Sequence, residues 1–213
     1  MPAAPLLADA AYGESTAFRT CLHEAALEYL VAVSPEIGVF AAETVFGAPE
    51  PSGKRGRPGS RLRPDRRPQS VRALAERLGG AAFRTLVCRT AADGEEVSSR
   101  FACVRVVAAH PVERDHLAPR VEWLIVEWPA QEAAPIDYWL SNLPEDAAPE
   151  RLARLARPRW TIELDYRQLK GELGLDHYEG RSYAGFHHHC ALVTRAHAFL
   201  TLERLCPKAR RPA

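Results

Sequence analysis

Cysteine, lysine and methionine are all scarce in this chain of 213 residues. The five cysteines are widely spaced and include no Cys-x-x-Cys pair, which argues against both a disulfide framework and a zinc ribbon. No run of about 18 apolar residues occurs, so a transmembrane helix is excluded. The first eight residues hold no base and Asp9 follows them directly, unlike a signal peptide. We therefore expect a soluble, cytoplasmic protein with no membrane partner.

The overall composition is that of an ordinary globular protein. Hydrophobic residues make up 46% of the chain and charged residues 26%. These proportions exclude a disordered, collagen-like or coiled-coil chain. The length fits between one and two domains, because a typical domain has about 150 residues.

The net charge of +1 conceals a strong alternation along the chain. Residues 1–53 hold one base and seven acids, 54–67 seven bases and one acid, 68–150 eight bases and thirteen acids, and 151–213 twelve bases and six acids. A chain patterned in this way can present a positive face to a polyanion and keep carboxylates elsewhere for a metal. Only Lys54, Lys170 and Lys208 are lysines, which reflects either a GC-rich genome or a need for bidentate phosphate contacts.

The N-terminal third predicts a strand, a helix and a second strand. Residues 5–13 are typical of a short strand that runs into a glycine turn. Residues 14–30 favour a helix that starts near Ser15 or Thr16, and residues 29–33 favour the next strand. This order predicts an α/β fold. The inward stripe of the helix is expected to consist of Phe18, Leu22, Ala25 and Leu27.

The rest of the chain divides into a basic loop, a β-rich region and a helical region. Residues 47–70 are rich in glycine, proline and arginine and predict a basic loop. Residues 71–78 favour a helix, and four strands follow at hairpin spacing over 84–89, 101–108, 121–128 and 136–140, which makes 71–143 a β-rich insertion. Helical patterns then cover 150–156, 159–173 and 187–205.

Residues 159–181 carry the most informative motif, Arg159-Trp-Thr-Ile-Glu-Leu-Asp-Tyr-Arg-Gln-Leu-Lys-Gly-Glu-Leu-Gly-Leu-Asp-His-Tyr-Glu-Gly-Arg181. On a helix that turns 100° per residue, Glu163 lies about 40° and Lys170 about 20° from Arg159. The three charges share a stripe that borders the apolar face. The structural alternative is an amphipathic helix whose charge pair contributes about 0.2–0.5 kcal/mol.

This spacing resembles the Tyr-x2-Arg-x3-Glu-x6-Lys signature of bacterial insertion-sequence transposases of the DDE type. Arg159, Glu163 and Lys170 occupy its last three places, whereas Ala156 stands in place of the tyrosine and Pro158 precedes Arg159. The resemblance extends along nearly the whole chain, through residues 7–19, 123–128, 138–143, 172–181 and 187–189.

The resemblance implies a partial RNase H-like core with a β-rich insertion. In that family three carboxylates, in the order Asp, Asp, Glu, form the catalytic site. Asp9 then takes the place of the second Asp and Glu163 that of the Glu, while no residue matches the first Asp. The implied divisions are residues 1–46 for the first part of the core, 47–70 for the basic loop, 71–146 for the insertion, and 147–213 for the helical part of the core that carries Glu163.

The implied activity is DNA transposition through strand cleavage and transfer. Two Mg²⁺ ions support in-line displacement at phosphorus in such sites, and Asp9 and Glu163 are the implied metal ligands. The implied partners are DNA, as terminal inverted repeats and target, and a homodimer or a mixed oligomer with full-length transposase. With one carboxylate missing, we expect a truncated, inactive enzyme that is associated with the nucleoid when bound to DNA.

Candidates for DNA contacts lie both inside and outside that motif. Arg159 and Lys170 are expected to clamp the DNA backbone. The loop arginines, Arg61 and Arg63 among them, either follow phosphates or belong to a solvated linker. Trp139 either stacks on an unpaired base or packs in the core, and the strand around it favours the core. His187, His188 and His189 invite a zinc hypothesis, but helical neighbours point about 100° apart.

Two rival functions follow from the same residues. A DNA-binding remnant would inhibit full-length transposase by occupying the ends of the element, and its binding would survive Asp9→Asn. An unrelated metal hydrolase would use the histidine run and would contain zinc.

Overall fold

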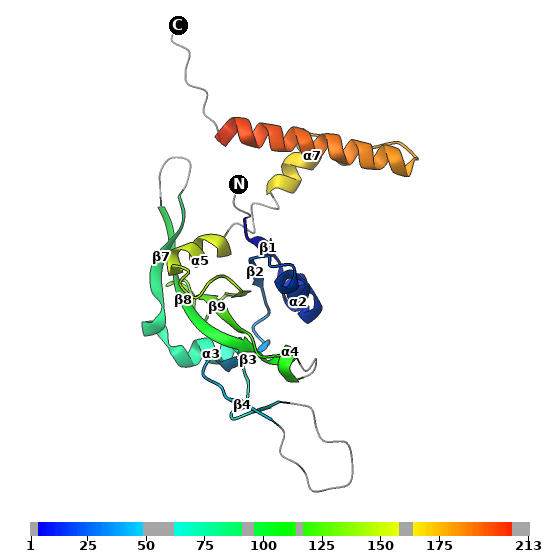
Figure 1. The fold of residues 1–213 in the computed structure, drawn as a ribbon. Coiled ribbons are helices and arrows are strands. Elements are labelled where there is room, and N and C mark those ends of the chain that lie inside the picture. The colour runs from blue at the N-terminus through cyan, green and yellow to red at the C-terminus, as the bar shows by residue number, and fades with distance from the viewer. Residues whose placement is uncertain (1–3, 49–61, 91–95, 114–116, 158–163, 206–213) are drawn as a thin grey trace, which may run out of the picture. The chain divides into compact units, whose positions relative to one another are not determined.

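A computed structural model describes residues 4–48, 62–90, 96–113, 117–157 and 164–205 (Figure 1). The chain forms two compact units, residues 1–157 and residues 158–213, and each is described by itself. Within the described residues, no helix combines the length and the apolar character needed to cross a membrane.

The first unit begins with the predicted strand, helix and strand. Strand β1 (Leu6–Ala8) leads into a single-turn helix α1 (Ala10–Gly13), then helix α2 (Thr16–Glu24) and strand β2 (Tyr29–Ala32). The two strands pair in parallel, with Leu7 opposite Leu30, so the predicted unit is confirmed.

Helix α2 is shorter than its sequence pattern predicted. The side chain of Ser15 caps its start by accepting a hydrogen bond from the backbone N–H of Phe18 at 3.2 Å. The helix ends at Glu24 instead of Leu30, because Ala26 adopts a left-handed conformation with φ 53°. Leu22 is buried, but Leu27 lies beyond the helix and is 41% exposed. The prediction that Leu27 belongs to the inward stripe is therefore wrong.

All four predicted strands of the middle region form and join β1 and β2 in one sheet. The sheet has the order β1-β2-β10-β9-β8-β3-β6, and β7 pairs with β8 off this path. Every pairing except β1 with β2 is antiparallel. The further strands are β3 (Gly38–Ala41), β6 (Gln69–Ser70), β7 (Arg84–Thr90), β8 (Glu96–Ala108), β9 (Val121–Glu127) and β10 (Asp137–Ser141). A separate two-stranded ribbon joins β4 (Phe46–Gly47) to β5 (Arg63–Pro64).

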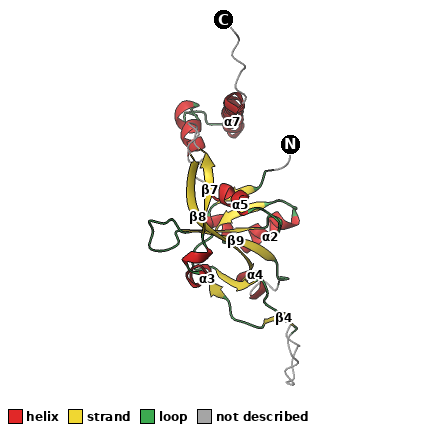
Figure 2. Ribbon diagram, turned by 90° about the vertical axis from the view of Figure 1, so that its left-hand side faces the viewer, coloured by secondary structure: helices red, strands yellow, loops and turns green. Residues whose placement is uncertain are grey.

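The two faces of the sheet are buried by different helices. Successive side chains on a strand point to opposite faces, so Leu124 and Val126 pack on the side of α2 and α3 (Val71–Leu78), while Ile125 packs on the side of α5 (Pro149–Ala156). Figure 2 shows the sheet with helices on its two sides. This mixed sheet with flanking helices confirms the predicted α/β class.

Helix α5 is also tied to the sheet by a buried charge pair. Glu127 at the end of β9 is 1% exposed, and its carboxylate accepts a hydrogen bond from the guanidinium of Arg157, directly after α5. Short helices complete the unit: η1 (Gly80–Ala82) and α4 (Ala109–Glu113).

The second unit is helical, as the sequence predicted. Residues 164–167 are α-helical and continue into a π-helical turn, η2 (Gln168–Glu172). The long helix α7 (Tyr183–Leu205) follows. Arg204 Nη1 donates to Gln168 Oε1 at 3.3 Å, and His197 Nε2 lies 3.5 Å from Asp165 Oδ1. These contacts hold α7 against the preceding turn. The division into core, loop and insertion stays a prediction.

Candidate active site and nearby polar pocket

Asp9 follows β1 directly and caps the start of α1. Its backbone is extended (φ −79°, ψ 179°), and Oδ1 accepts a hydrogen bond from the N–H of Tyr12 at 3.3 Å. The side chain is exposed. In open α/β sheets, ligands bind beyond the carboxyl ends of parallel strands, and Asp9 occupies such a position beside β2. Because a carboxylate has about four lone-pair sites, this single cap bond leaves it capacity for a metal ion.

The turn after Asp9 is held closely against β2. Gly13 ends α1, and a β-carbon there would overlap the carbonyl oxygen of Ala32. The guanidinium of Arg19 donates to the carbonyl oxygen of Gly13. Glu14 Oε1 accepts a hydrogen bond from the N–H of Ser34 at 3.2 Å, just beyond β2. These contacts fix the direction in which the chain leaves β1, and with it the position of Asp9.

Lys170 lies on the π-helical turn of the second unit. It is exposed, and its Nζ lies 5.8 Å from the centre of the Tyr166 ring. Tyr166 is itself 54% exposed. Arg159 and Glu163, which the sequence places in the same motif, lie outside the described residues.

The π-helical turn changes the predicted helical wheel. The N–H of Leu173 donates to the carbonyl oxygen of Gln168 at 3.0 Å, five residues earlier. A wheel of 100° per residue assumes bonds between residues four apart, so the predicted angle between Arg159 and Lys170 does not hold through residues 168–172. Single π-helical turns are frequent at functional sites, which draws attention to Lys170.

The basic loop is described only in part. Arg63 lies on β5 and is exposed, while Arg61 lies outside the described residues. Arg66 pairs with Glu43 at 3.0 Å and with Asp65 at 3.3 Å. Exposed pairs of this kind are weak, but they direct the Arg66 guanidinium toward neighbouring acids.

Trp139 lies in the core. It is 5% exposed and belongs to the cluster on the α5 side of the sheet, with Ile125 and Leu152. A buried indole does not present its face to a base, so this placement argues against a role as a stacking platform and for core packing.

The three neighbouring histidines are directed to different partners. His187 contacts Tyr183 edge to face with ring centres 4.2 Å apart, and His189 Nε2 lies 2.9 Å from the carbonyl oxygen of Gly174. His188 is exposed. In the part of the chain that the structure describes, no three His, Cys, Asp or Glu side chains gather as metal ligands. Asp9 is the one predicted metal ligand within those residues, so its partnership with Glu163 stays a prediction. Cys190, which follows His189 along α7, is half-buried.

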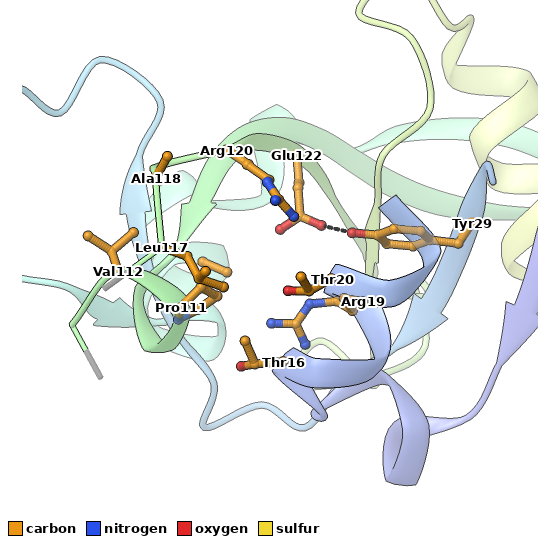
Figure 3. Close-up of a pocket in the computed structure, with 11 residues that line it drawn as sticks. Thr16, Arg19, Thr20, Tyr29, Pro111, Val112, Leu117, Ala118, Arg120 and Glu122 are labelled. Atoms are coloured by element: carbon orange, nitrogen blue, oxygen red, sulfur yellow. Dashed lines mark hydrogen bonds between the residues drawn. The ribbon is translucent and has the colours of Figure 1, made fainter. Parts of the chain in front are cut away.

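A polar pocket that sequence reasoning missed lies between α2 and the start of β9 (Figure 3). Arg19 is 4% and Glu122 7% exposed, and the hydroxyl of Tyr29 donates to Glu122 Oε1. The signal in the sequence was periodicity: Arg19 lies one helical turn before the buried Leu22, and Glu122 lies two residues before the buried Leu124. Charged residues at inward positions of an otherwise apolar pattern indicate a buried polar site.

Residues 1–95 match a family model described as DDE superfamily endonuclease. The matched segment contains Asp9, the α1 turn, β2 and α3, and it ends before β8. No curated protein matches the chain. The N-terminal part of this chain is therefore similar to DDE-type endonucleases, in agreement with the DDE type predicted from the sequence.

Proposed function

We propose that the chain is part of a DDE transposase of an insertion sequence and that Asp9 and Glu163 supply two of its three metal-binding carboxylates. The position of Asp9 carries this proposal: an exposed carboxylate directly after a parallel strand, inside the segment that is similar to DDE endonucleases. The signature spacing of Arg159, Glu163 and Lys170 supports it independently, because these residues lie outside that segment.

Carboxylates suit this chemistry because Mg²⁺ prefers hard oxygen ligands. When bound, a pair of Mg²⁺ ions stabilises the charge that builds on the attacking and leaving oxygens during displacement at phosphorus. The contribution of Asp9 is to present its oxygens from a fixed turn. The Arg19 contact and the close approach of Gly13 to Ala32 hold that turn in place.

The basic residues are proposed to bind the DNA backbone. Lys170 is exposed and extends from an irregular helical turn. Arg159 belongs to the same motif, and Arg63 is exposed on the β4–β5 ribbon. Phosphate contacts of this kind position the duplex and carry no sequence information.

We expect this chain alone to bind DNA without cutting it, because no residue of the sequence is assigned as the first Asp. A DNA-binding remnant that blocks full-length transposase is the second candidate. It is favoured by the exposed bases Lys170 and Arg63, which can contact phosphates without any metal ion. The two candidates differ in whether Asp9 and Glu163 still bind a metal ion.

A gel assay on DNA that flanks the gene tests the proposal. The purified chain is incubated with labelled duplex at several salt concentrations, with Mg²⁺ or with EDTA. The proposal predicts binding that weakens steeply with salt and no nicking in either condition. Mg²⁺-dependent nicking that Asp9→Asn leaves intact would contradict it. So would zinc in the purified protein together with hydrolytic activity that His188→Ala abolishes.

A further inference from the structure

The pocket beside α2 is a small cavity lined by several parts of the first unit. Its lining residues come mainly from α2, from α4, from residues 117–120 and from the start of β9, and its volume is about 30 Å³. One water molecule needs about 10–15 Å³ on this scale. The cavity therefore has room for about two or three water molecules or one small polyatomic group, and it is too small for a nucleoside.

Arg19 directs an unsatisfied donor into this cavity. One nitrogen of its guanidinium, Nη1, donates to the carbonyl oxygen of Gly13. The other, Nη2, is buried and has no hydrogen-bond partner within the described residues. Figure 3 shows the guanidinium extending from α2 toward Pro111 and Leu117. Leaving a charged donor buried and unpaired is costly, so the geometry indicates a missing acceptor.

Thr16 and Arg120 add further donors around the same space. The hydroxyl of Thr16 is buried and also lacks a partner among the described residues. Arg120 lines the opposite wall and extends toward Arg19 and Glu122 (Figure 3). Two guanidinium groups and a hydroxyl thus converge on a cavity of a few water volumes.

Among the described residues that line the pocket, Glu122 is the one carboxylate, and the Tyr29 phenol satisfies part of its hydrogen-bonding capacity. The phenol donates to Glu122 Oε1. Burial and the nearby carboxylate both raise the pKa of Tyr29 above its ordinary value, so the phenol keeps its proton and remains a donor at neutral pH. With Glu122 counted against Arg19 and Arg120, the described residues that line the pocket carry one net positive charge.

We propose that this pocket binds a small oxyanion of the phosphate class. A planar guanidinium matches the oxygens of such an anion in a bidentate fashion, and one negative charge balances the pocket. The group comes from one of two sources, free inorganic phosphate or a phosphate of a DNA strand. The site lies within the first unit and does not depend on the proposed transposase function.

Calorimetric titration of the full chain with inorganic phosphate, at constant ionic strength, tests the proposal. The variants are Arg120→Gln and Thr16→Val, and Arg77→Gln on the exposed side of α3 is the matched control. Arg19 is left intact because its bond to Gly13 is structural. We expect saturable binding by the wild type and the control, at least tenfold weaker binding by Arg120→Gln, and a smaller loss with Thr16→Val.

Three outcomes would overturn the proposal. One is no saturable binding by the wild type, which would make the cavity a water site. The second is equal binding by Arg120→Gln and Arg77→Gln, which would indicate nonspecific attraction. The third is a loss of phosphate affinity in Arg120→Gln that thermal unfolding traces to misfolding, while Thr16→Val is folded and binds phosphate like the wild type.

A second titration distinguishes the two sources of the anion. Duplex DNA is added to the chain with and without saturating phosphate, again at constant ionic strength. If the pocket takes a DNA phosphate, free phosphate weakens DNA binding and Arg120→Gln reproduces the loss. If the pocket takes a free anion, DNA binding is unchanged by phosphate. Both results support an oxyanion site and assign its occupant.

Discussion

The guanidinium of Arg19 donates a hydrogen bond to the carbonyl oxygen of Gly13, the last residue of the turn that Asp9 begins. This contact joins helix α2 to the end of β1. The proposed metal ligand and the proposed oxyanion pocket therefore share one structural element. Changes at Gly13 should disturb Asp9 first, because α1 connects the two residues directly.

We expect Gly13→Ala to destabilise the fold by about 1–3 kcal/mol, the usual penalty for overpacking. The added β-carbon would overlap the carbonyl oxygen of Ala32, which is fixed in β2. Urea unfolding followed by tryptophan fluorescence measures the change. Gly47→Ala is the control, since its β-carbon would meet its nearest neighbour at 3.9 Å, an ordinary contact. Equal stability of the two variants would show that the close approach at Gly13 is absent.

Tyr29→Phe should change how stability depends on alkaline pH. The pKa of Tyr29 is raised in the folded protein by burial and by Glu122, whereas the unfolded chain has the ordinary value of about 10. Above that pH the unfolded state loses its proton first, so the stability of the wild type falls as pH rises. Thermal unfolding between pH 8 and 11 should show a steeper decline for the wild type than for Tyr29→Phe. Parallel curves would contradict the assignment.

The pair between Arg157 and Glu127 should show an asymmetric response to mutation. Arg157→Gln leaves a fully buried carboxylate without its partner. We expect a loss in unfolding free energy smaller than the roughly 3–5 kcal/mol of a fully buried pair, because the Arg157 side chain is 37% exposed. The double variant Arg157→Gln with Glu127→Gln should recover most of that loss, because no buried charge remains. Urea unfolding provides the measurement. If Arg157→Gln matches the exposed control Arg154→Gln, the buried pair does not stabilise α5 against the sheet.

Periodicity and spacing predicted much of this fold. The strands β7 to β10, the helix α3 and the strand-helix-strand order of β1, α2 and β2 follow from the apolar patterns and from the loop lengths between them. The end of α2 did not follow, because Ala26 is not a residue type that signals a left-handed turn. The joining of the middle strands to β2 was also not predicted, since pairing between distant strands leaves no local pattern.

The candidate site was predictable to a smaller extent. Asp9 at the end of a strand followed from the local pattern and from the family resemblance. The π-helical turn at 168–172 did not, because the wheel assumes a regular helix. The pocket was missed because Arg19 and Glu122 become partners of one cavity only after α2 packs beside β9. Their inward phase on a helix and a strand was the available signal.

Lys170 and Arg63 should contribute to DNA affinity to the same extent whatever the DNA sequence. Each exposed base that contacts a phosphate contributes to the salt dependence, so Lys170→Gln should reduce the slope of log affinity against log salt by about 1. Arg63→Gln should act similarly, and the affinity should fall alike for unrelated sequences. Fluorescence anisotropy with two unrelated duplexes measures both effects. An unchanged slope in both variants would remove these residues from the DNA-binding surface.

The partnership of Asp9 with Glu163 is tested most directly by Mn²⁺ binding, followed by electron paramagnetic resonance. We predict that Asp9→Asn and Glu163→Gln each weaken Mn²⁺ binding about tenfold or more. The double variant should lose no more Mn²⁺ affinity than the product of the two single losses. The control variants Glu24→Gln and Glu172→Gln, at exposed carboxylates, should bind like the wild type. Mn²⁺ affinity that is indifferent to Asp9→Asn would contradict the central claim.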